Sequence, residues 1–180
     1  MNLERLRGLK QPDQRSCGPT SLVAAHLLLD PSYEPASFSD DVLALHRRIT
    51  GPAAFGRAQL PWPRALGTPP WAAAHTMTEL TGVPHRTHVA RWGDRSDDLV
   101  RLAAAGHPCP LYIGDRLLPR HVVLVVAAGA DGVRVYNPAH GTLVDVSRDA
   151  FETGRLRTTG SWDRPWFVIT PRPRARRTGA

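Results

Sequence analysis

The segment around Cys17 combines residue types that can build a reactive thiol. Residues 11–20 read QPDQRSCGPT, and the chain then stays apolar through residue 29. This change predicts that Cys17 lies where a loop becomes a helix. Unpaired amides and the dipole at a helix N-terminus favour thiolate over thiol, and the same amides can stabilise an oxyanion. Gln11, six residues upstream, can supply a second donor, so the segment indicates acyl transfer through a cysteine.

A cysteine nucleophile also needs a base within hydrogen-bond reach and a third group that orients this base. Among the eight histidines, His121 stands out because it begins the β-forming run HVVLVV, which places its ring at the rim of a central strand. The DG pair at 131–132 is a hairpin signal, so residues 121–128 and 132–137 are expected to pair. Antiparallel pairing brings Asn137 near His121. Its side-chain oxygen can then accept the imidazole N–H and select the tautomer.

Each of these residues also has a purely structural interpretation. A lone free cysteine is most often a small buried core residue, and Cys17 can be one. His121 can cap a strand, and an asparagine before a proline, as at Asn137, is a common turn residue. Gln14, three residues before Cys17, competes with Gln11 for the oxyanion role. The combination of the upstream glutamine, the Gly-Pro pair and the helix start favours the catalytic interpretation.

The elements that must position these residues are first helical and then extended. Apolar spacing and end signals predict helices at 18–29, 38–48, 71–81 and 96–105. Extended patterns predict strands at 86–92, 109–113, 121–127, 133–136 and 166–170. The Gly- and Pro-rich segment 50–70 is expected to be a long irregular loop and a binding surface. We expect Trp62, Trp71 and Trp92 to be core plugs and loop anchors, with the lining of a cleft as the alternative for Trp62. The fold class is therefore α+β, with N-terminal helices packed on a mostly antiparallel sheet.

Length and composition predict one folded domain and a basic tail. A chain of 180 residues, 42% of them hydrophobic, can bury a core, and we assign residues 1–170 to a single domain. Residues 171–180 contain four arginines and no acidic residue, so we expect them to be disordered. The net charge of +7 thus falls to +3 for the domain. No aromatic or glycine-rich recognition motif accompanies the arginines, so nucleic acid is not expected as the main partner.

The cysteine count and the hydropathy exclude several other classes. Cys17 and Cys109 are too few for a disulfide framework or a four-cysteine zinc site, and the histidines near Cys109 match no ligand spacing. Neither a metal nor a cofactor is therefore expected. No segment reads as a secretion signal, and no apolar run approaches the roughly 20 residues that span a bilayer. We expect a cytoplasmic protein without membrane contact.

Three motifs carry a family resemblance. They are Gln11 with CGP at 17–19, GHPCPLY at 106–112 ahead of HVVLVV at 121–126, and GVRVYNPAHG at 132–141. In these motifs the chain resembles the papain-like cysteine peptidases, and most closely the bacterial double-glycine leader peptidase group. The similarity extends from residue 11 to about residue 170, where 147–151 and 166–170 are similar to the closing helix and strand of that group.

The resemblance implies a papain-like fold and a role for each matching residue. Cys17 would be the nucleophile, His121 the general base, Asn137 the residue that orients the base, and Gln11 the oxyanion donor. Asn137 departs from the leader peptidase group, which usually has aspartate at this position, and agrees with papain itself. The implied partner is a peptide or protein substrate.

Three functions stay open at this point. The first is a hydrolase that cleaves a peptide or isopeptide bond through an acyl-enzyme on Cys17. The second is acyl transfer or deamidation by the same residues, as in transglutaminase-like enzymes, because water and an amine attack the same intermediate. The third is a papain-like domain that binds without catalysis and whose arginine-rich tail contacts an acidic partner. Neither the substrate nor the oligomeric state is predicted.

Overall fold

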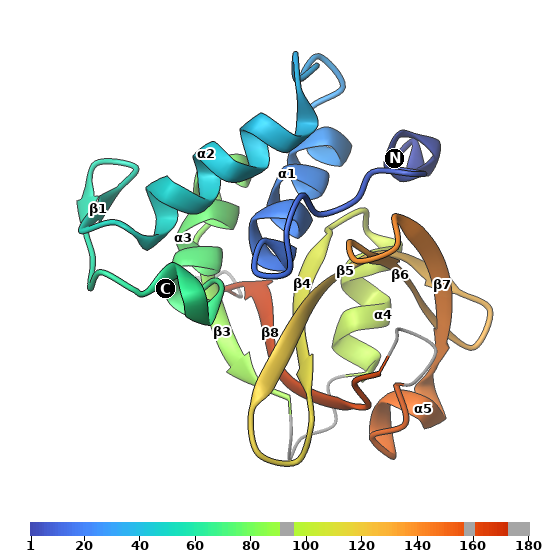
Figure 1. The fold of residues 1–180 in the computed structure, drawn as a ribbon. Coiled ribbons are helices and arrows are strands. Elements are labelled where there is room, and N and C mark those ends of the chain that lie inside the picture. The colour runs from blue at the N-terminus through green and yellow to red at the C-terminus, as the bar shows by residue number, and fades with distance from the viewer. Residues whose placement is uncertain (91–95, 157–160, 173–180) are drawn as a thin grey trace, which may run out of the picture.

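Two groups of helices lie on opposite faces of a six-stranded sheet in the computed structural model, which describes residues 1–90, 96–156 and 161–172 (Figure 1). The helices are α1 (Cys17–Leu29), α2 (Phe38–Thr50), α3 (Pro70–Thr81), α4 (Ser96–Ala104) and α5 (Arg148–Glu152), with the 3-10 turns η1 (Leu3–Leu6) and η2 (Arg64–Leu66). The sheet contains β3 (His85–Val89), β4 (Cys109–Gly114), β5 (Pro119–Gly129), β6 (Gly132–Asn137), β7 (Thr142–Ser147) and β8 (Arg164–Pro171). Its order is β3-β8-β4-β5-β6-β7, and each neighbouring pair is antiparallel.

This architecture confirms the α+β prediction of helices followed by an antiparallel sheet. The four predicted helices are present with ends shifted by at most two residues. Strand β7 was not predicted, and the segment expected to be irregular contains η2 and a small hairpin of β1 (Ala53–Ala54) and β2 (Arg57–Ala58). Positions 91 and 92 of the predicted strand 86–92, and positions 173–180 of the predicted tail, lie outside the described residues. Strand β8 extends one residue into the predicted tail, because Pro171 pairs with His85.

Strand β5 is buried on both faces, which explains its unbroken run of apolar residues. Val122, Leu124 and Val126 belong to the core cluster shared with α1 and α3, whereas Val123 and Val125 belong to a second cluster shared with α4. Alternate side chains of a strand point to opposite faces, so each face of β5 needs its own apolar set. This central strand begins near His121 and gives it a rigid support.

Helix α1 is the element that carries Cys17 into the core. Eleven of its thirteen residues are buried, as its apolar sequence predicts. The hydroxyl of Ser21 donates to the carbonyl of Val122 at 3.2 Å and so connects α1 to β5. At the other end of the helix, the guanidinium of Arg5 donates to the carbonyls of Leu27 and Tyr33, both at 2.6 Å. The Ser21 bond thus fixes the N-terminal half of α1 on the sheet, and the Arg5 bonds connect the C-terminal end of the helix to η1.

Candidate active site

Cys17 is the first residue of α1 and lies beside the beginning of β5. Its side chain is 7% exposed. Backbone amides of Val122, Gly18 and Cys17 itself hydrogen-bond to the sulfur. Because Val122 directly follows His121 in the chain, the thiol lies next to the backbone of the predicted base.

Burial dominates the electrostatics of this thiol. Loss of contact with water raises the pKa of Cys17 above its ordinary value, the three amides lower the pKa only in part, and the carboxylate of Asp13 raises it further. The amides at the helix N-terminus thus favour the thiolate, as expected, but burial outweighs them in this structure. Removing a thiolate from water costs more than the terminal amides offset. Cys17 consequently needs a base that takes its proton.

A hydrogen bond joins the two other residues predicted for this site, His121 and Asn137. Nε2 of His121 lies 3.0 Å from Oδ1 of Asn137, and both side chains are buried. The predicted β5–β6 hairpin produces this contact: Leu124 pairs with Tyr136, so the end of β6 runs towards the beginning of β5. Oδ1 of Asn137 also accepts the amide of Ala139 at 3.0 Å, which restrains the side chain. An amide oxygen only accepts, so Nε2 is the donor and Nδ1 stays available for a second partner.

The surroundings of His121 keep its imidazole neutral. Burial lowers the pKa of His121 below its ordinary value of 6.5, the bond to Asn137 raises it in part, and the nearby His140 lowers it. A neutral imidazole can accept a proton at neutral pH, which a general base must do. Both pKa shifts thus favour the uncharged forms, a protonated thiol and a neutral imidazole.

Gln11 reaches this region through its backbone. Its amide N–H donates to the carbonyl of Pro138 at 2.9 Å. Its side-chain Nε2 donates to the carbonyl of Asp13 at 2.8 Å, and Oε1 is buried without a hydrogen-bond partner in the described parts of the chain. The side chain of Gln11 is thus turned towards Asp13 and does not line the cleft beside Cys17. The competing Gln14 is exposed and does not line that cleft either.

Cys17 and His121 both line a cleft of about 480 Å³. One side is the segment that leads from η2 into α3, and the other side comes from β4, β5 and β8. Its wall is mostly apolar and aromatic, with Trp62, Leu66, Pro69, Pro70, Trp71, Tyr112, Pro119, Val122 and Phe167. Trp62 and Trp71 pack edge to face with ring centroids 5.2 Å apart. Trp62 and Trp71 therefore line a cleft, which was expected only as the alternative for Trp62.

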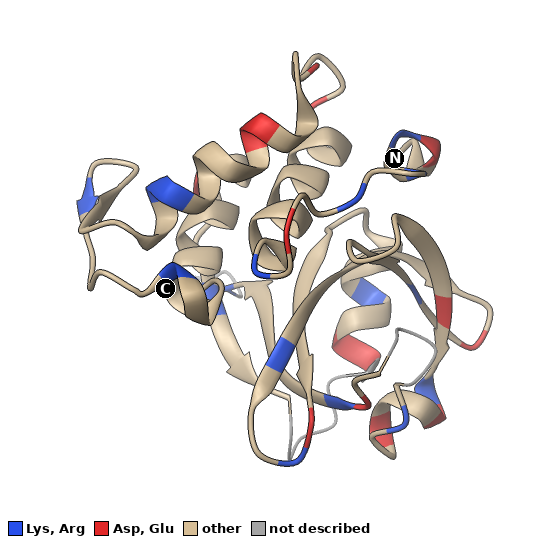
Figure 2. Cartoon of the chain, viewed as in Figure 1, with Lys and Arg blue, Asp and Glu red and all other residues tan. Residues whose placement is uncertain are grey.

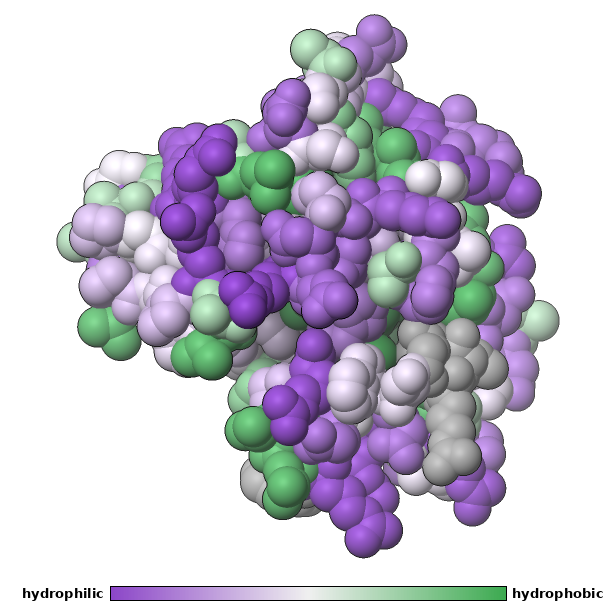
Figure 3. Space-filling view, in the orientation of Figure 1, coloured by the Kyte–Doolittle hydropathy of each residue, from purple (hydrophilic) through white to green (hydrophobic). Residues whose placement is uncertain are grey.

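Other residues of the cleft carried no signal in the sequence. Thr68, Tyr112 and Phe167 come from segments far apart in the chain, and the phenolic hydroxyl of Tyr112 donates to the carbonyl of Thr68 at 3.1 Å. Leu66 of the cleft wall is exposed, and so are three leucines outside the wall, Leu60, Leu117 and Leu118. On the face shown in Figure 3, hydrophobic surface gathers over the η2 region and over the turn between β4 and β5.

Three polar atoms interrupt the apolar wall. Nε1 of Trp62, Nε1 of Trp71 and Oγ1 of Thr68 are buried and have no hydrogen-bond partner among residues 1–90, 96–156 and 161–172. Indole N–H groups only donate, whereas a hydroxyl both donates and accepts.

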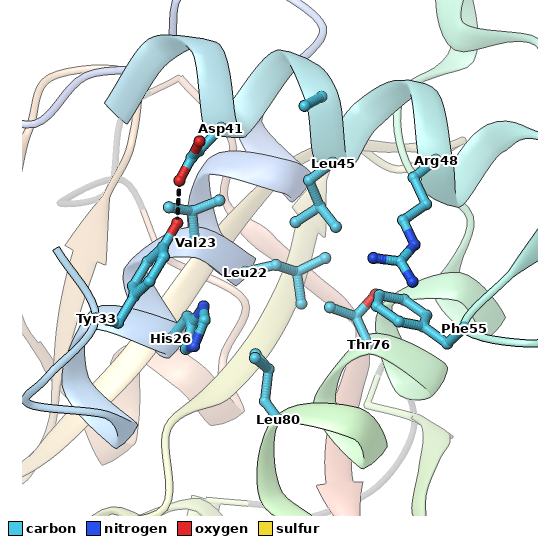
Figure 4. Close-up of a pocket in the computed structure, with 11 residues that line it drawn as sticks. Leu22, Val23, His26, Tyr33, Asp41, Leu45, Arg48, Phe55, Thr76 and Leu80 are labelled. Carbon is cyan, nitrogen blue, oxygen red and sulfur yellow. Dashed lines mark hydrogen bonds between the residues drawn. The ribbon is translucent and has the colours of Figure 1, made fainter. Parts of the chain in front are cut away.

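A second cavity of the molecule has no cysteine in its wall. It has a volume of about 310 Å³ and lies between α1, α2 and α3 (Figure 4). Tyr33 donates to Asp41 at one end of this cavity and Arg48 lies over the Phe55 ring at the other, but Cys17 is not part of its wall.

Cys109 is fully buried, and this burial raises its pKa to about 12. Such a thiol is inert at neutral pH. Within the described residues, no three His, Cys, Asp or Glu side chains are grouped so that they could hold a metal ion.

Solved structures resemble this fold along almost its whole length. The peptidase domain of Streptococcus ComA, described as a bi-functional ABC transporter involved in a quorum-sensing pathway, superposes with a TM-score of 0.53 at 15% sequence identity, over 92% of this chain and 96% of that domain. The chain has a papain-like peptidase fold. The peptidase domain of Streptococcus mutans ComA matches with a TM-score of 0.47 at 14% identity, over 92% and 98% of the two chains. No protein-family profile and no curated protein sequence matches the chain.

The papain-like fold predicted from the three sequence motifs is thus confirmed, and the likeness is to the kind of peptidase domain that the motifs indicated. At 15% identity the likeness concerns the fold, and the chemistry has to be argued from this chain's own residues. No helix in the described part of the chain is both long enough and apolar enough to cross a membrane.

Proposed function

We propose that this protein is a cysteine peptidase that hydrolyses a peptide or isopeptide bond through an acyl-enzyme on Cys17. The observation that carries the proposal is the placement of Cys17 and His121 in one cleft, with Asn137 accepting a hydrogen bond from Nε2 of His121 at 3.0 Å. These are the three roles of nucleophile, base and orienting group. The fold of a peptidase domain supports the same reaction class.

The proposed reaction begins with proton transfer from the thiol of Cys17 to the imidazole of His121. Nδ1 of His121 takes the thiol proton of Cys17 while the sulfur attacks the substrate carbonyl carbon. The resulting oxyanion accepts the backbone N–H of Cys17. Gln11 can add a second N–H only after its side chain turns from the carbonyl of Asp13 into the cleft, and this turn is part of the proposal. The imidazolium then protonates the leaving amine, which departs and leaves a thioester. His121 next deprotonates a water molecule, which attacks the thioester and releases the acid and the thiol.

Asn137 and the burial of Cys17 and His121 each favour the proposed proton transfer. Asn137 selects the tautomer with hydrogen on Nε2, so the lone pair of Nδ1 is free for the thiol proton. Burial of both reacting groups strengthens the attraction between the ions that form when the proton moves. Although the pKa of Cys17 is raised, the thiolate can therefore still form, but only at the moment when the sulfur attacks the substrate.

The same raised pKa favours a second candidate, a papain-like domain that binds peptides without cleaving them. In that case the thiol stays protonated throughout and reacts slowly with electrophiles. Acyl transfer to an amine and deamidation of glutamine share the proposed intermediate with hydrolysis, and they differ only in the acceptor or in the amide that is attacked.

The deciding experiment compares two cysteine variants. We expect iodoacetamide to label the wild type at Cys17, Cys17→Ala to abolish both labelling and turnover, and Cys109→Ala to retain both, since Cys109 is buried with a pKa of about 12. Mass spectrometry locates the label. Equal labelling of Cys17→Ala and the wild type would refute the assignment, and an unreactive Cys17 in a folded protein would select the binding domain.

A peptide pool that contains glutamine distinguishes the three reactions by their products. Hydrolysis shortens the peptides, deamidation adds about one dalton, and acyl transfer adds the mass of an amine.

A further inference from the structure

A second, polar pocket adjoins the apolar cleft. It has a volume of about 530 Å³, and its wall includes Arg15, Arg47, Arg64, Asp13 and His46. Arg15 precedes α1, Arg47 lies in the last turn of α2 and Arg64 begins η2. Figure 2 shows basic segments at these three places. We call this cavity the basic pocket.

The three arginines of the basic pocket have no carboxylate partner within the described residues. Five arginines elsewhere pair with a nearby acid, namely Arg7 with Glu4, Arg101 with Asp98, Arg120 with Asp115, Arg134 with Asp145 and Arg148 with Asp97. The carboxylate of Asp13, on the same wall, accepts the backbone amide of Arg15 through Oδ1. Three guanidinium groups against one carboxylate leave the basic pocket with a surplus of two positive charges.

The basic pocket and the Cys17 cleft share a wall at Gly67. Gly67 lines the cleft, and a Cβ atom at this glycine would lie 3.8 Å from the carbonyl oxygen of Arg15. His46 lines the basic pocket on the other side, and its ring lies close enough to the backbone of Gly67 for that backbone to affect the pKa of His46. Arg64 and Leu66, within one turn of η2, face the basic pocket and the cleft respectively. The basic pocket and the cleft are therefore neighbours across the short segment from Arg64 to Gly67.

His46 adds a polar group that a free anion would not need. The side chain is 5% exposed and Nε2 is buried without a hydrogen-bond partner in the described structure. A nitrogen of a neutral imidazole can pair with a peptide N–H or C=O group, according to the tautomer. The basic pocket thus offers one group that can pair with a peptide backbone and three guanidinium donors for carboxylates, which is the complement of an acidic peptide segment.

We propose that the basic pocket binds carboxylate groups of the substrate while the neighbouring residues of the substrate occupy the Cys17 cleft. The inference rests on the proposed function, because it assigns acidic peptides as the substrate class of that site. Exposed ion pairs each contribute little, and together they give a selectivity of roughly threefold to tenfold for an acidic over an isosteric neutral peptide.

The test measures binding to Cys17→Ala by fluorescence anisotropy, so it does not depend on turnover. One probe is a fluorescein-labelled, C-terminally amidated peptide with two aspartates flanked by leucines, and the second has asparagines in their place. A third probe has asparagines and a free C-terminal carboxylate, which separates side-chain from terminal carboxylates. We expect the aspartate peptide to bind roughly threefold to tenfold more tightly than the amidated asparagine peptide. The ratio should approach one at high salt, because salt screens exposed charges.

Variants with equal changes in net charge locate the effect. Arg47→Gln combined with Arg64→Gln should bring the ratio between the aspartate and asparagine peptides to about one. Arg57→Glu changes the net charge by the same amount on the exposed strand β2, outside the basic pocket, and should keep the ratio of its parent. Circular dichroism verifies that each variant is folded.

Three outcomes would overturn the inference. They are equal binding of the aspartate and both asparagine peptides, an equal loss of selectivity in Arg57→Glu, and tight binding of a fluorescein-labelled oligouridylate that the double variant abolishes. Failure of the proposed function looks different: the acidic peptide still binds selectively, but Cys17 does not react with iodoacetamide and the wild type cleaves no peptide. Cleavage without carboxylate selectivity refutes the basic pocket alone.

Discussion

The pKa of Cys17 depends more on its burial by neighbouring residues than on its place at the start of a helix. Burial raises the pKa of the thiol, while burial of His121 lowers the pKa of the imidazole. Both shifts favour the uncharged pair over the thiolate–imidazolium pair. Asn137 is the neighbour that opposes this trend, since its hydrogen bond raises the pKa of His121.

Substitutions at Asn137 should move the acid limb of the pH profile in opposite directions. His121 must be neutral to accept a proton, so activity of the wild type is lost as pH falls through its lowered pKa, below 6.5. Asn137→Ala removes a bond that raises this pKa, and the limb should move to lower pH. Asn137→Asp adds a negative charge that favours the imidazolium, and the limb should move to higher pH.

Substitution of Asn137 should also lower kcat, in addition to moving the acid limb of the pH profile. A positioned base supplies about 10²–10⁴-fold, and we expect kcat of Asn137→Ala to fall by roughly tenfold or more as the ring loses its orientation. Measurements of kcat/KM between acidic and alkaline pH give the limb of the free enzyme. A limb that stays in place, or that moves the same way in both variants, would contradict a hydrogen-bonded His121–Asn137 pair in the working enzyme.

At the scale of elements, the cleft exists because a loop presses against the first turn of α1. A Cβ atom at Gly18 would lie 2.4 Å from Oγ1 and 2.6 Å from Cβ of Thr68, so position 18 must be a glycine for the loop to come this close. The hydroxyl of Tyr112 on β4 holds the same loop by donating to the carbonyl of Thr68. The helix, the loop and the sheet therefore meet within one residue of the nucleophile.

Gly18→Ala should destabilise the protein by about 1–3 kcal/mol, the usual range for an overpacked core, and reduce kcat/KM by displacing the loop. Thr68→Gly removes the side chain that clashes. The double variant should therefore be more stable than the sum of the two single effects predicts. Denaturant unfolding of all four proteins gives this coupling energy. Strictly additive effects would show that the two positions are not in contact.

At the scale of the whole molecule, the last described strand, β8, is inserted between two strands that come earlier in the chain. Strand β8 lies between β3 and β4, so it connects the part of the sheet that packs on α3 with the part that carries His121. Val168 and Ile169 are fully buried in β8 and belong to the two different core clusters. The amide of Arg172 donates to the carbonyl of Pro84 at 2.7 Å, immediately after the strand.

Truncation at two positions tests the predicted division into a domain and a tail. A chain that ends at Arg172 should have an unfolding free energy within about 0.5 kcal/mol of the full chain, as changes outside the packed structure usually do. A chain that ends at Asp163 lacks β8 and should not fold, because two neighbouring strands lose their partner. Chemical denaturation followed by circular dichroism compares the three chains. A large loss of stability in the longer truncated chain would assign a structural role to residues beyond Arg172.

The sequence alone was sufficient for features that depend on neighbours along the chain. A helix beginning at Cys17, the β5–β6 hairpin and the contact of His121 with Asn137, sixteen residues away, follow from apolar spacing and turn chemistry. The three motifs also indicated the papain-like fold. Strand β7 escaped prediction because its side chains are largely intermediate or exposed, so it lacks a strong apolar pattern.

Only the tertiary structure decided how the thiol behaves and what lies around it. The pKa of Cys17 rises because strands and loops from distant parts of the chain exclude water, and no local pattern records that exclusion. The same holds for the cleft, whose Thr68, Tyr112 and Phe167 meet only through packing, and for the unpaired arginines of the basic pocket. Local signals thus predicted which groups are present, whereas desolvation and long-range packing determined their charge states and their neighbours.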